Sequence, residues 1–328
     1  GGEAASESGG ANAGVDIAGI YAEDGEDPAE ISNITISGNV NLTATGIGGE
    51  ATTTTGTADA SVAVGGIANK GSGTITVEGN TTINSIATAG TQGGTPNDGE
   101  AIAWGVSASS GIIDLQGDVV VTTSATSSTD SMAKNYALDA TNGTLNINQA
   151  GGKKVQLTGD VGFDSTGTAG KINVNFDTSD SFLKGLVNNT GTGTEANLTF
   201  SNGATWSPTG DGAITSNFGT DGTGLILDTG GILDMAAWNL NSARVNESNA
   251  YRALTISGKA DLKDGAVFRI NTDVVGGHSD TIAFTTAPAV AGTQYIQIGY
   301  DPGIAAQLDA GATTLTSGTP LTVLTGVT

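Results

Sequence analysis

Residues 66–84 read GIANKGSGTITVEGNTTIN, and the pattern of this stretch recurs along the first half of the chain. It has an apolar start at Ile67, a short strand-like run at Ile75-Thr76-Val77, and a Gly79-Asn80 pair before a second strand-like run. Equivalent apolar starts occur three more times, at Ile20, Val106 and Leu138. Such self-similarity indicates a repeat architecture in which each unit packs only against its neighbours.

The Gly-Asn or Gly-Asp pair is the most regular mark of this repeat. It occurs four times, at Gly38-Asn39, Gly79-Asn80, Gly117-Asp118 and Gly159-Asp160. One unit is therefore about 40 residues long. The fourth unit has an insertion after Leu145-Asn146-Ile147, and its last strand is expected at Val161-Gly162-Phe163. We expect the pairs to form sharp corners in which glycine takes a positive φ.

Two architectures accept a unit of this size: a propeller blade of four antiparallel strands, and two coils of a parallel β-helix at about 20 residues per coil. The unit starts are 47, 39 and 32 residues apart, and aromatic residues make up only 5%. A solenoid tolerates such variation, because extra residues such as the acidic stretch 23–32 form a lateral loop. The sequence therefore predicts an all-β, right-handed parallel β-helix of about twelve coils and about 58 Å over residues 15–250.

Composition and charge exclude several classes of protein. The chain has 328 residues, of which 52 are glycine and none is cysteine, and its net charge is −22. Without cysteine there is no disulfide framework, no Cys-type zinc site and no cysteine nucleophile. The 11 Lys and Arg residues are too few and too scattered to neutralise nucleic-acid phosphates, so we expect no nucleic-acid partner.

Few residues are suited to catalysis. His278 is the only histidine and no Gly-x-Ser-x-Gly elbow is present, so we interpret His278 as a solvated turn residue. Carboxylates serve glycosidases and lyases, but most Asp residues here lie beside Gly or Asn in turns, without a basic cluster. We therefore expect no enzyme and no cofactor. Calcium is the one metal to weigh, because Asp211-Gly212 and Asp221-Gly222 offer oxygen ligands.

The C-terminal segment has a different pattern from about Ala250 onward. Its four elements occur in the order Leu254-Thr255-Ile256-Ser257-Gly258, Gly265-Ala266-Val267-Phe268-Arg269-Ile270-Asn271-Thr272-Asp273, Ser279-Asp280-Thr281-Ile282 and Ala291-Gly292-Thr293-Gln294-Tyr295-Ile296-Gln297-Ile298. In order and spacing they resemble the autochaperone or junction region of type V autotransporter passengers, which include pertactin-like and adhesin-like proteins. We accordingly divide the chain into β-helix repeats of two coils per unit at 1–250 and an autochaperone cap at 251–328.

The resemblance implies a folding role for this cap. In that family the C-terminal part of the passenger folds first outside the cell and templates the stacking of the other coils during secretion. A solenoid also needs a cap, because its last coil otherwise exposes an unpaired edge and an open core. The residues assigned to the cap are Phe268, Ile270, Asp280, Ile282, Phe284, Tyr295, Ile296 and Ile298. All but Asp280 are expected in its core, and the alternative is that these are simply core residues of a strand sandwich.

The resemblance also implies display at the bacterial surface from the outer membrane, with a signal peptide and an outer-membrane barrel elsewhere in a longer protein. The first hypothesis for function is an adhesin or self-association module that contacts a host cell or a neighbouring cell, through protein or glycan. The second is a passive stalk that carries an N-terminal effector region. The third, which the lack of a basic cluster disfavours, is a carbohydrate-cleaving β-helix enzyme; it requires carboxylates in one groove with a nearby cation.

Overall fold

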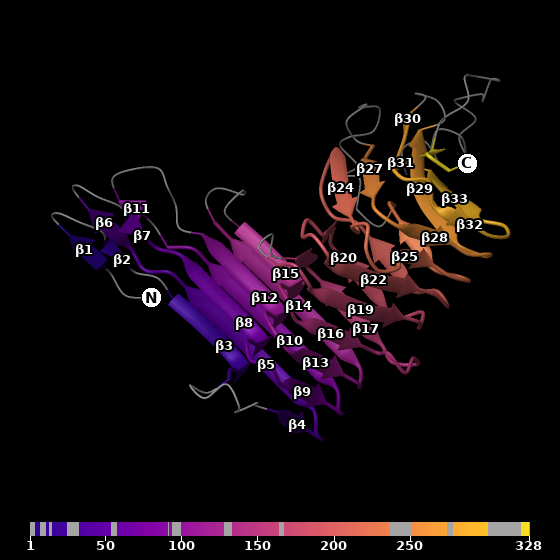
Figure 1. Ribbon diagram of the computed structural model, residues 1–328. Coiled ribbons are helices and arrows are strands. Elements are labelled where there is room, and N and C mark those ends of the chain that lie inside the picture. Colours follow the sequence, from indigo (N-terminus) through magenta and orange to yellow (C-terminus); the bar gives the residue numbers. More distant parts are fainter. Residues whose placement is uncertain are drawn as a thin grey trace.

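The computed structural model describes residues 4–6, 11–12, 15–24, 33–53, 58–90, 92–93, 100–127, 133–163, 167–236, 251–273, 278–300 and 323–327. Regular secondary structure in these ranges consists of β-strands, and they contain no helix. The strands stack in chain order into an elongated body (Figure 1). The predicted all-β class is therefore confirmed.

Three long sheets form the sides of a solenoid. Sheet 1 has ten parallel strands, which are β3 (Val15–Ala22), β8 (Val62–Asn69), β12 (Ala101–Ala108), β15 (Ala133–Ala140), β18 (Asp160–Phe163), β21 (Val187–Asn188), β24 (Ala213–Asn217), β27 (Ala253–Ser257), β31 (Thr281–Phe284) and β34 (Leu324–Thr325). Sheet 2 has nine parallel strands, which are β4 (Ile34–Ile36), β9 (Thr74–Val77), β13 (Ile112–Leu115), β16 (Thr144–Ile147), β19 (Lys171–Phe176), β22 (Glu195–Phe200), β25 (Gly224–Leu227), β28 (Ala260–Leu262) and β32 (Ala289–Val290).

Sheet 3 has ten strands. Nine are parallel: β5 (Val40–Ile47), β10 (Thr81–Thr88), β14 (Val119–Thr126), β17 (Val155–Thr158), β20 (Phe182–Lys184), β23 (Thr205–Ser207), β26 (Ile232–Asp234), β29 (Val267–Asp273) and β33 (Tyr295–Tyr300). The tenth, β30 (His278–Ser279), pairs antiparallel with β29. Two small sheets complete the structure, one of β1 (Ala4–Ser6), β6 (Ala51–Thr53) and β11 (Gln92–Gly93), the other of β2 (Ala11–Asn12) and β7 (Ala58–Asp59).

One strand from each long sheet, taken in chain order, makes one coil of the solenoid. The second coil consists of β8, β9 and β10, and nine such coils stack between β3 and β33. The four predicted unit starts lie in one column of sheet 1, because Ile67 pairs with Ile20 and Val106, and Val106 pairs with Leu138. The predicted repeat is thus confirmed at the level of residue pairs.

Each repeat unit is a single coil, so the prediction of two coils per unit is wrong. Ile75 pairs directly with Ile34, 41 residues before it, and with Ile113, 38 residues after it. The first coils are long because their strands in sheets 1 and 3 have eight residues. The later coils are shorter, and Lys171 pairs with Glu195 after only 24 residues. Nine coils with a rise of about 4.8 Å span about 38 Å, less than the predicted length.

The fourth unit also differs from its predicted strand positions. Its third strand is β17, which pairs with β14, and not Val161-Gly162-Phe163. Val161 belongs to β18, where it pairs with Leu138 and so opens the fifth coil. The Gly159-Asp160 pair therefore lies between two coils. The repeat pattern is misleading here because β17 has four residues, half the length of β14, so the next coil starts sooner.

Columns of apolar side chains fill the interior of the coils. In sheet 2, successive coils place one buried residue above another, as in the column of Ile75, Ile113, Leu145 and Ile172. In the shorter coils these columns become aromatic. The buried rings of Phe176 and Phe200 stack with centroids 4.4 Å apart, and Trp206 packs edge-on against Phe218 at 5.4 Å. Each coil therefore covers the apolar face of the coil before it.

Lack of space, and not a positive φ, requires glycine at the corner between sheets 2 and 3. Of the four glycines predicted to have a positive φ, Gly159 does (127°), whereas Gly38, Gly79 and Gly117, which form this corner, do not. A Cβ on Gly79 would lie 2.3 Å from the carbonyl oxygen of Gly38, and a Cβ on Gly117 would lie 2.3 Å from that of Gly79. The backbones of successive corners stack too closely for any side chain.

The residue after each corner glycine links one coil to the next. Asn39 Oδ1 accepts a hydrogen bond from the backbone N–H of Asn80 at 2.8 Å, and Asn80 Oδ1 accepts one from the backbone N–H of Asp118 at 3.0 Å. Asp118 Oδ1 in turn accepts one from the backbone N–H of Lys154 at 3.0 Å. The ladder explains why Asn or Asp follows the corner glycine in the first three units, since their short side chains carry an acceptor that reaches the backbone of the next coil.

The long coils contain a second, smaller core. The cluster consists of Ala44, Val62, Val64, Ala87, Ala101 and Ala103, from strands of sheets 1 and 3. Pairing in sheet 1 skips Gly66 and Gly105, the point at which each strand passes from this second core to the main one. A Cβ on Gly66 would lie 2.5 Å from the carbonyl oxygen of Gly105, so glycine is needed at this bend as well.

The three sheets continue past residue 250. β27, β28 and β29 pair in parallel with β24, β25 and β26, and so add an eighth coil to the stack. The alternation of Trp238-Asn239-Leu240 predicts one further strand, which falls within 237–250 and so outside the described residues. The division at residue 250 stays a prediction.

Candidate functional site

Four of the predicted cap residues lie in the interior of the last coils. Phe268, Ile270, Ile282 and Phe284 are each at most 5% exposed. Phe268 continues the inward column of Leu233 in sheet 3, and Ile282 and Phe284 pair with residues of β27 in sheet 1. Their burial is the same as that of core residues in the earlier coils.

The other three apolar cap residues are exposed, so their expected place in the core is wrong. Tyr295, Ile296 and Ile298 are 55%, 45% and 54% exposed. Ile296 and Ile298 pair with Phe268 and Ile270 and therefore continue two inward columns. They lie on β33, and no further strand of sheet 3 follows it among the described residues. Residues in an inward column are buried only when another coil covers them.

Asp280 is the centre of a buried polar network in the cap. Its Oδ1 accepts a hydrogen bond from the backbone N–H of Arg252 at 2.9 Å, and its Oδ2 accepts one from that of Asn271 at 2.8 Å. The guanidinium of Arg252 donates to the carbonyl oxygens of Pro208, at 2.8 Å, and of Met235. Burial raises the pKa of Asp280 and lowers that of Arg252, while their mutual attraction opposes both shifts.

The other candidates from the sequence, His278 and the two Asp-Gly pairs, do not form a catalytic or metal site in the described part of the chain. His278 is partly buried on β30, where its ring stacks on Tyr251 with centroids 6.0 Å apart, so it is not a fully solvated turn residue. Gly212 and Gly222 have positive φ angles, as expected of turns. No group of three His, Cys, Asp or Glu residues that could hold a metal ion occurs within the described ranges.

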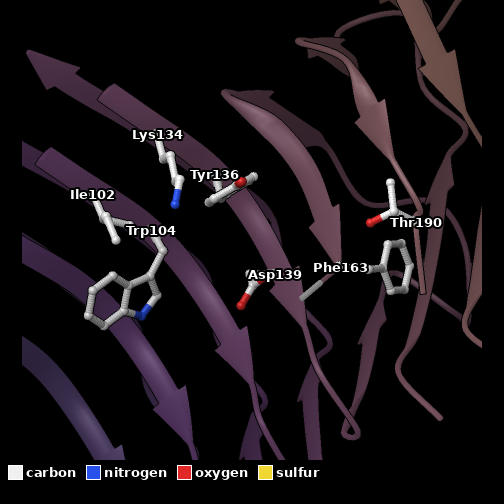
Figure 2. A pocket seen from close by; sticks show the side chains of 7 residues that line it. All are labelled: Ile102, Trp104, Lys134, Tyr136, Asp139, Phe163 and Thr190. Atoms are coloured by element: carbon white, nitrogen blue, oxygen red, sulfur yellow. The ribbon is translucent and has the colours of Figure 1, made fainter. Parts of the chain in front are cut away.

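A hollow of about 380 Å³ lies on the outer face of sheet 1. Side chains from β12, β15 and β18 and one residue after β21 line it: Ile102, Trp104, Lys134, Tyr136, Asp139, Phe163 and Thr190 (Figure 2). The sheet narrows here, because β15 has eight residues whereas β18 has four and begins with Asp160 opposite Tyr136. The hollow is located at this step between the long coils and the short ones.

The two largest side chains in the hollow are opposite each other on neighbouring strands. Trp104 pairs with Tyr136, and their rings extend in opposite directions along the sheet (Figure 2). A Cβ on Gly65 of β8 would lie 2.2 Å from Cε2 of the indole, and a Cβ on Gly162 of β18 would lie 2.6 Å from Cδ1 of the phenol ring. Each ring therefore lies over a glycine, and both aromatic residues are partly buried. The Trp104 Nε1–H has no hydrogen-bond acceptor in the described part of the chain.

Polar side chains accompany the two rings. Lys134 lines the hollow and forms an ion pair with Glu100. Asp139 Oδ2 accepts a hydrogen bond from Ser107 Oγ at 3.2 Å. Both Lys134 and Asp139 are on β15, so the hollow presents a cation and a carboxylate on one strand.

Asp160 pairs with Tyr136, a residue that lines the hollow. Its Oδ1 accepts a hydrogen bond from the backbone N–H of Leu186 at 2.7 Å, and burial raises its pKa to about 6. Burial also raises the pKa of Tyr136; Lys134 opposes this shift, and the charges of Asp139 and Asp160 add to it. This carboxylate is thus a group that changes charge near neutral pH.

Sequence reasoning missed this hollow. The two rings belong to units whose apolar starts are recognisable, but the repeat was defined by inward-facing residues and corners, and not by the residues that face outward. The available signal is a column with Gly65, Trp104, Tyr136 and Asp160 at equivalent positions, flanked by Gly162. In this column two adjacent aromatic residues follow a glycine on the outward side of the strands.

Comparisons with family models, curated proteins and solved structures gave no match for this chain. The described ranges also contain no helix long and apolar enough to cross a membrane.

Proposed function

We propose that the chain is part of the passenger of a type V autotransporter, pertactin-like in architecture. The parallel three-sheet solenoid and the order of the C-terminal motifs support this assignment. The coil is right-handed, as crossover connections between parallel strands of one sheet almost always are. The passenger is displayed at the surface of a Gram-negative-type bacterium, and an outer-membrane barrel in the full-length protein anchors or exports it.

The function that the geometry supports best is adhesion to a host cell or to a neighbouring cell, including aggregation of cells that carry the same protein. The hollow around Trp104 and Tyr136 is the observation that carries this conclusion. A passive stalk needs only a polar surface, whereas clustered, half-buried aromatic rings with a few polar groups are typical of binding sites. The strongly acidic composition argues for a partner other than nucleic acid.

The last coils are proposed as the folding template of the passenger. Asp280, directly before β31, accepts hydrogen bonds from the backbone N–H of Arg252, directly before β27, and of Asn271 in β29. The buried apolar residues of these strands belong to the same core as those of the earlier coils. A template of this kind offers a paired, closed coil onto which the next coil adds its strands.

The carbohydrate-cleaving alternative has one observation in its favour. Asp139 and Lys134 both line the hollow, and Asp160 pairs with the lining residue Tyr136, so carboxylates and a cation occur together as this hypothesis required. Release of reducing sugar from glycans, abolished in both Asp139→Asn and Asp160→Asn, would favour this alternative over adhesion.

The test of the adhesin function uses the purified chain and cells that express the full protein. We expect association of the chain to depend on its concentration, or the chain to inhibit cell clumping or attachment to host cells. A strict monomer that neither clumps cells nor competes would overturn the proposal for this part of the protein. The stalk hypothesis would then apply, with the effector in another part of the protein.

A further inference from the structure

We propose that the hollow on sheet 1 binds a neutral glycan, with Trp104 and Tyr136 as stacking platforms. The inference rests on the proposed adhesin function and names the ligand class of its binding surface. It places the ligand on the outer face of the sheet between β12 and β18, at the step where the coils shorten. The ends of the solenoid and the free edges of its strands take no part in it.

The aromatic rings are held in a geometry that suits a sugar. A pyranose ring presents C–H groups on its faces and hydroxyl groups around its edge, so it packs on an aromatic face while its edge stays polar. Trp104 and Tyr136 lie over Gly65 and Gly162, and both side chains line the hollow. Since the sheet already restricts both side chains, binding costs little additional side-chain entropy.

The groups around the rings match the hydroxyl edge of a sugar. Asp139 supplies carboxylate acceptors, Thr190 supplies a hydroxyl, and Lys134 supplies an ammonium donor, all from the lining of the hollow. A carboxylate can accept from two neighbouring hydroxyl groups at once, an arrangement that fixes the orientation of the bound ring. An apolar floor with a few placed polar groups is the usual composition of a small-ligand site.

The charge around the hollow selects against acidic glycans. Glu100, Asp139 and Asp160 place three carboxyl groups near Tyr136, against the single ammonium of Lys134. The whole chain adds a net charge of −22, which repels uronates, sialylated glycans and phosphates. A neutral saccharide meets no such electrostatic penalty and still uses every hydrogen-bonding group.

The size of the hollow sets the length of glycan that it contacts. Its volume of about 380 Å³ lies at the lower end of the range of about 300–1,000 Å³ found for small-ligand sites. This is room for about two sugar rings, one for each aromatic platform. We therefore expect oligosaccharides to bind more tightly than the corresponding monosaccharide.

The experiment is calorimetric titration of the purified chain with four probes of matched length: cello-, malto- and galacto-oligosaccharides as neutral glycans, and oligogalacturonate as the acidic one. We expect saturable binding of at least one neutral series and much weaker binding of oligogalacturonate. Trp104→Ala and Tyr136→Ala should each weaken binding of the neutral probe about tenfold.

Tyr21→Ala is the matched control. Tyr21 is an exposed aromatic residue of β3, in the same sheet but outside the hollow, and its replacement should leave the affinity unchanged. Trp104→Phe keeps a ring over Gly65 and should lose less affinity than Trp104→Ala. This variant also serves as the reporter if the alanine variant does not fold.

Absence of binding to all three neutral probes, or equal binding of oligogalacturonate, would overturn the inference. An equal loss of affinity in Tyr21→Ala would overturn it as well. Clumping by cells that carry the Trp104→Ala and Tyr136→Ala changes separates the two proposals. Glycan binding by a chain that never clumps cells or blocks attachment supports the site and counts against the adhesin function. Undiminished clumping without any glycan binding supports the adhesin function and overturns the site.

Discussion

The carboxylate of Asp280 accepts a hydrogen bond from the backbone N–H of Arg252 at 2.9 Å, and this bond joins the segments that precede β31 and β27. The same buried carboxylate reaches β29 through the backbone N–H of Asn271. A single side chain thus connects sheets 1 and 3 in the last coils. We therefore expect the stability of the C-terminal coils to depend on Asp280.

We expect Asp280→Asn to lower the free energy of unfolding by about 1–3 kcal/mol, because the amide keeps only one acceptor oxygen and leaves the backbone N–H of either Arg252 or Asn271 unpaired in the interior. Urea denaturation followed by circular dichroism measures the change. Asp114→Asn is the control, since Asp114 on β13 contacts Gln116 at the surface, and it should change stability by less than about 0.5 kcal/mol. Equal effects of the two changes would contradict the central role of Asp280.

Asp160→Asn should raise stability in a manner that depends on pH. The pKa of Asp160 is about 6 in the folded chain, against about 3.9 in an unfolded chain, so the folded state binds the proton more tightly. The ionised carboxylate therefore destabilises the native state at neutral pH, and this effect fades as the pH falls through 6 towards 4.

We expect Asp160→Asn to increase the free energy of unfolding by about 1–3 kcal/mol near pH 7.5 and by less than about 1 kcal/mol near pH 4. Thermal or urea unfolding of both proteins across this range measures the difference, in which the general effect of the acidic surface cancels. A difference that is constant with pH, or that grows as the pH falls, would show that Asp160 is not the titrating group.

Gly79→Ala and Gly117→Ala should each destabilise the solenoid by about 1–3 kcal/mol, because the new Cβ has no room beneath the preceding corner. Gly38→Ala is a closely matched control: it occupies the same corner in the first coil, and its Cβ would meet no atom within 4 Å. We expect that change to be neutral or slightly stabilising. Denaturation midpoints of the three variants measure the effect, and equal losses in all three would rule out stacking as the reason for glycine.

Phe200→Ala should lower the free energy of unfolding by about 3–5 kcal/mol, since it opens a cavity between the buried rings of Phe176 and Trp206. Phe200→Leu keeps most of the volume and should cost less than half as much. Tyr295→Ala, at an exposed ring of the last strand, should cost under about 1 kcal/mol. Calorimetric unfolding ranks the three changes, and a ranking with Tyr295→Ala first would contradict the assignment of the core.

Several structural features follow from short-range patterns and are readable in the sequence. Ile67 and Val106 can be matched from the sequence alone, because residues that stack in a solenoid have the same size and face in each coil. The pairs Gly79-Asn80 and Gly117-Asp118 are likewise recognisable as corners. The physical reason for glycine at these corners cannot be recognised in the sequence, because the close contact that excludes a side chain is made by the backbone of another coil.

Other features depend on contacts between distant parts of the chain. A unit of about 40 residues could make one coil or two. The pairing of Ile75 with Ile34 and Ile113 decides this question, and no local sequence pattern reveals that pairing. The exposure of Ile296 depends on whether another coil covers β33, although its sequence position is that of a core residue.

The all-β class, the repeat, the corners and the inward columns are readable in the sequence, because strand alternation and turn chemistry act over a few residues. The number of coils, the second core and the hollow arise only when the coils pack against one another. These depend on where an eight-residue strand lies beside a four-residue one, as β15 does beside β18. The hollow exists because neighbouring coils differ in length, and such a difference is a relation between coils and not a property of any one of them.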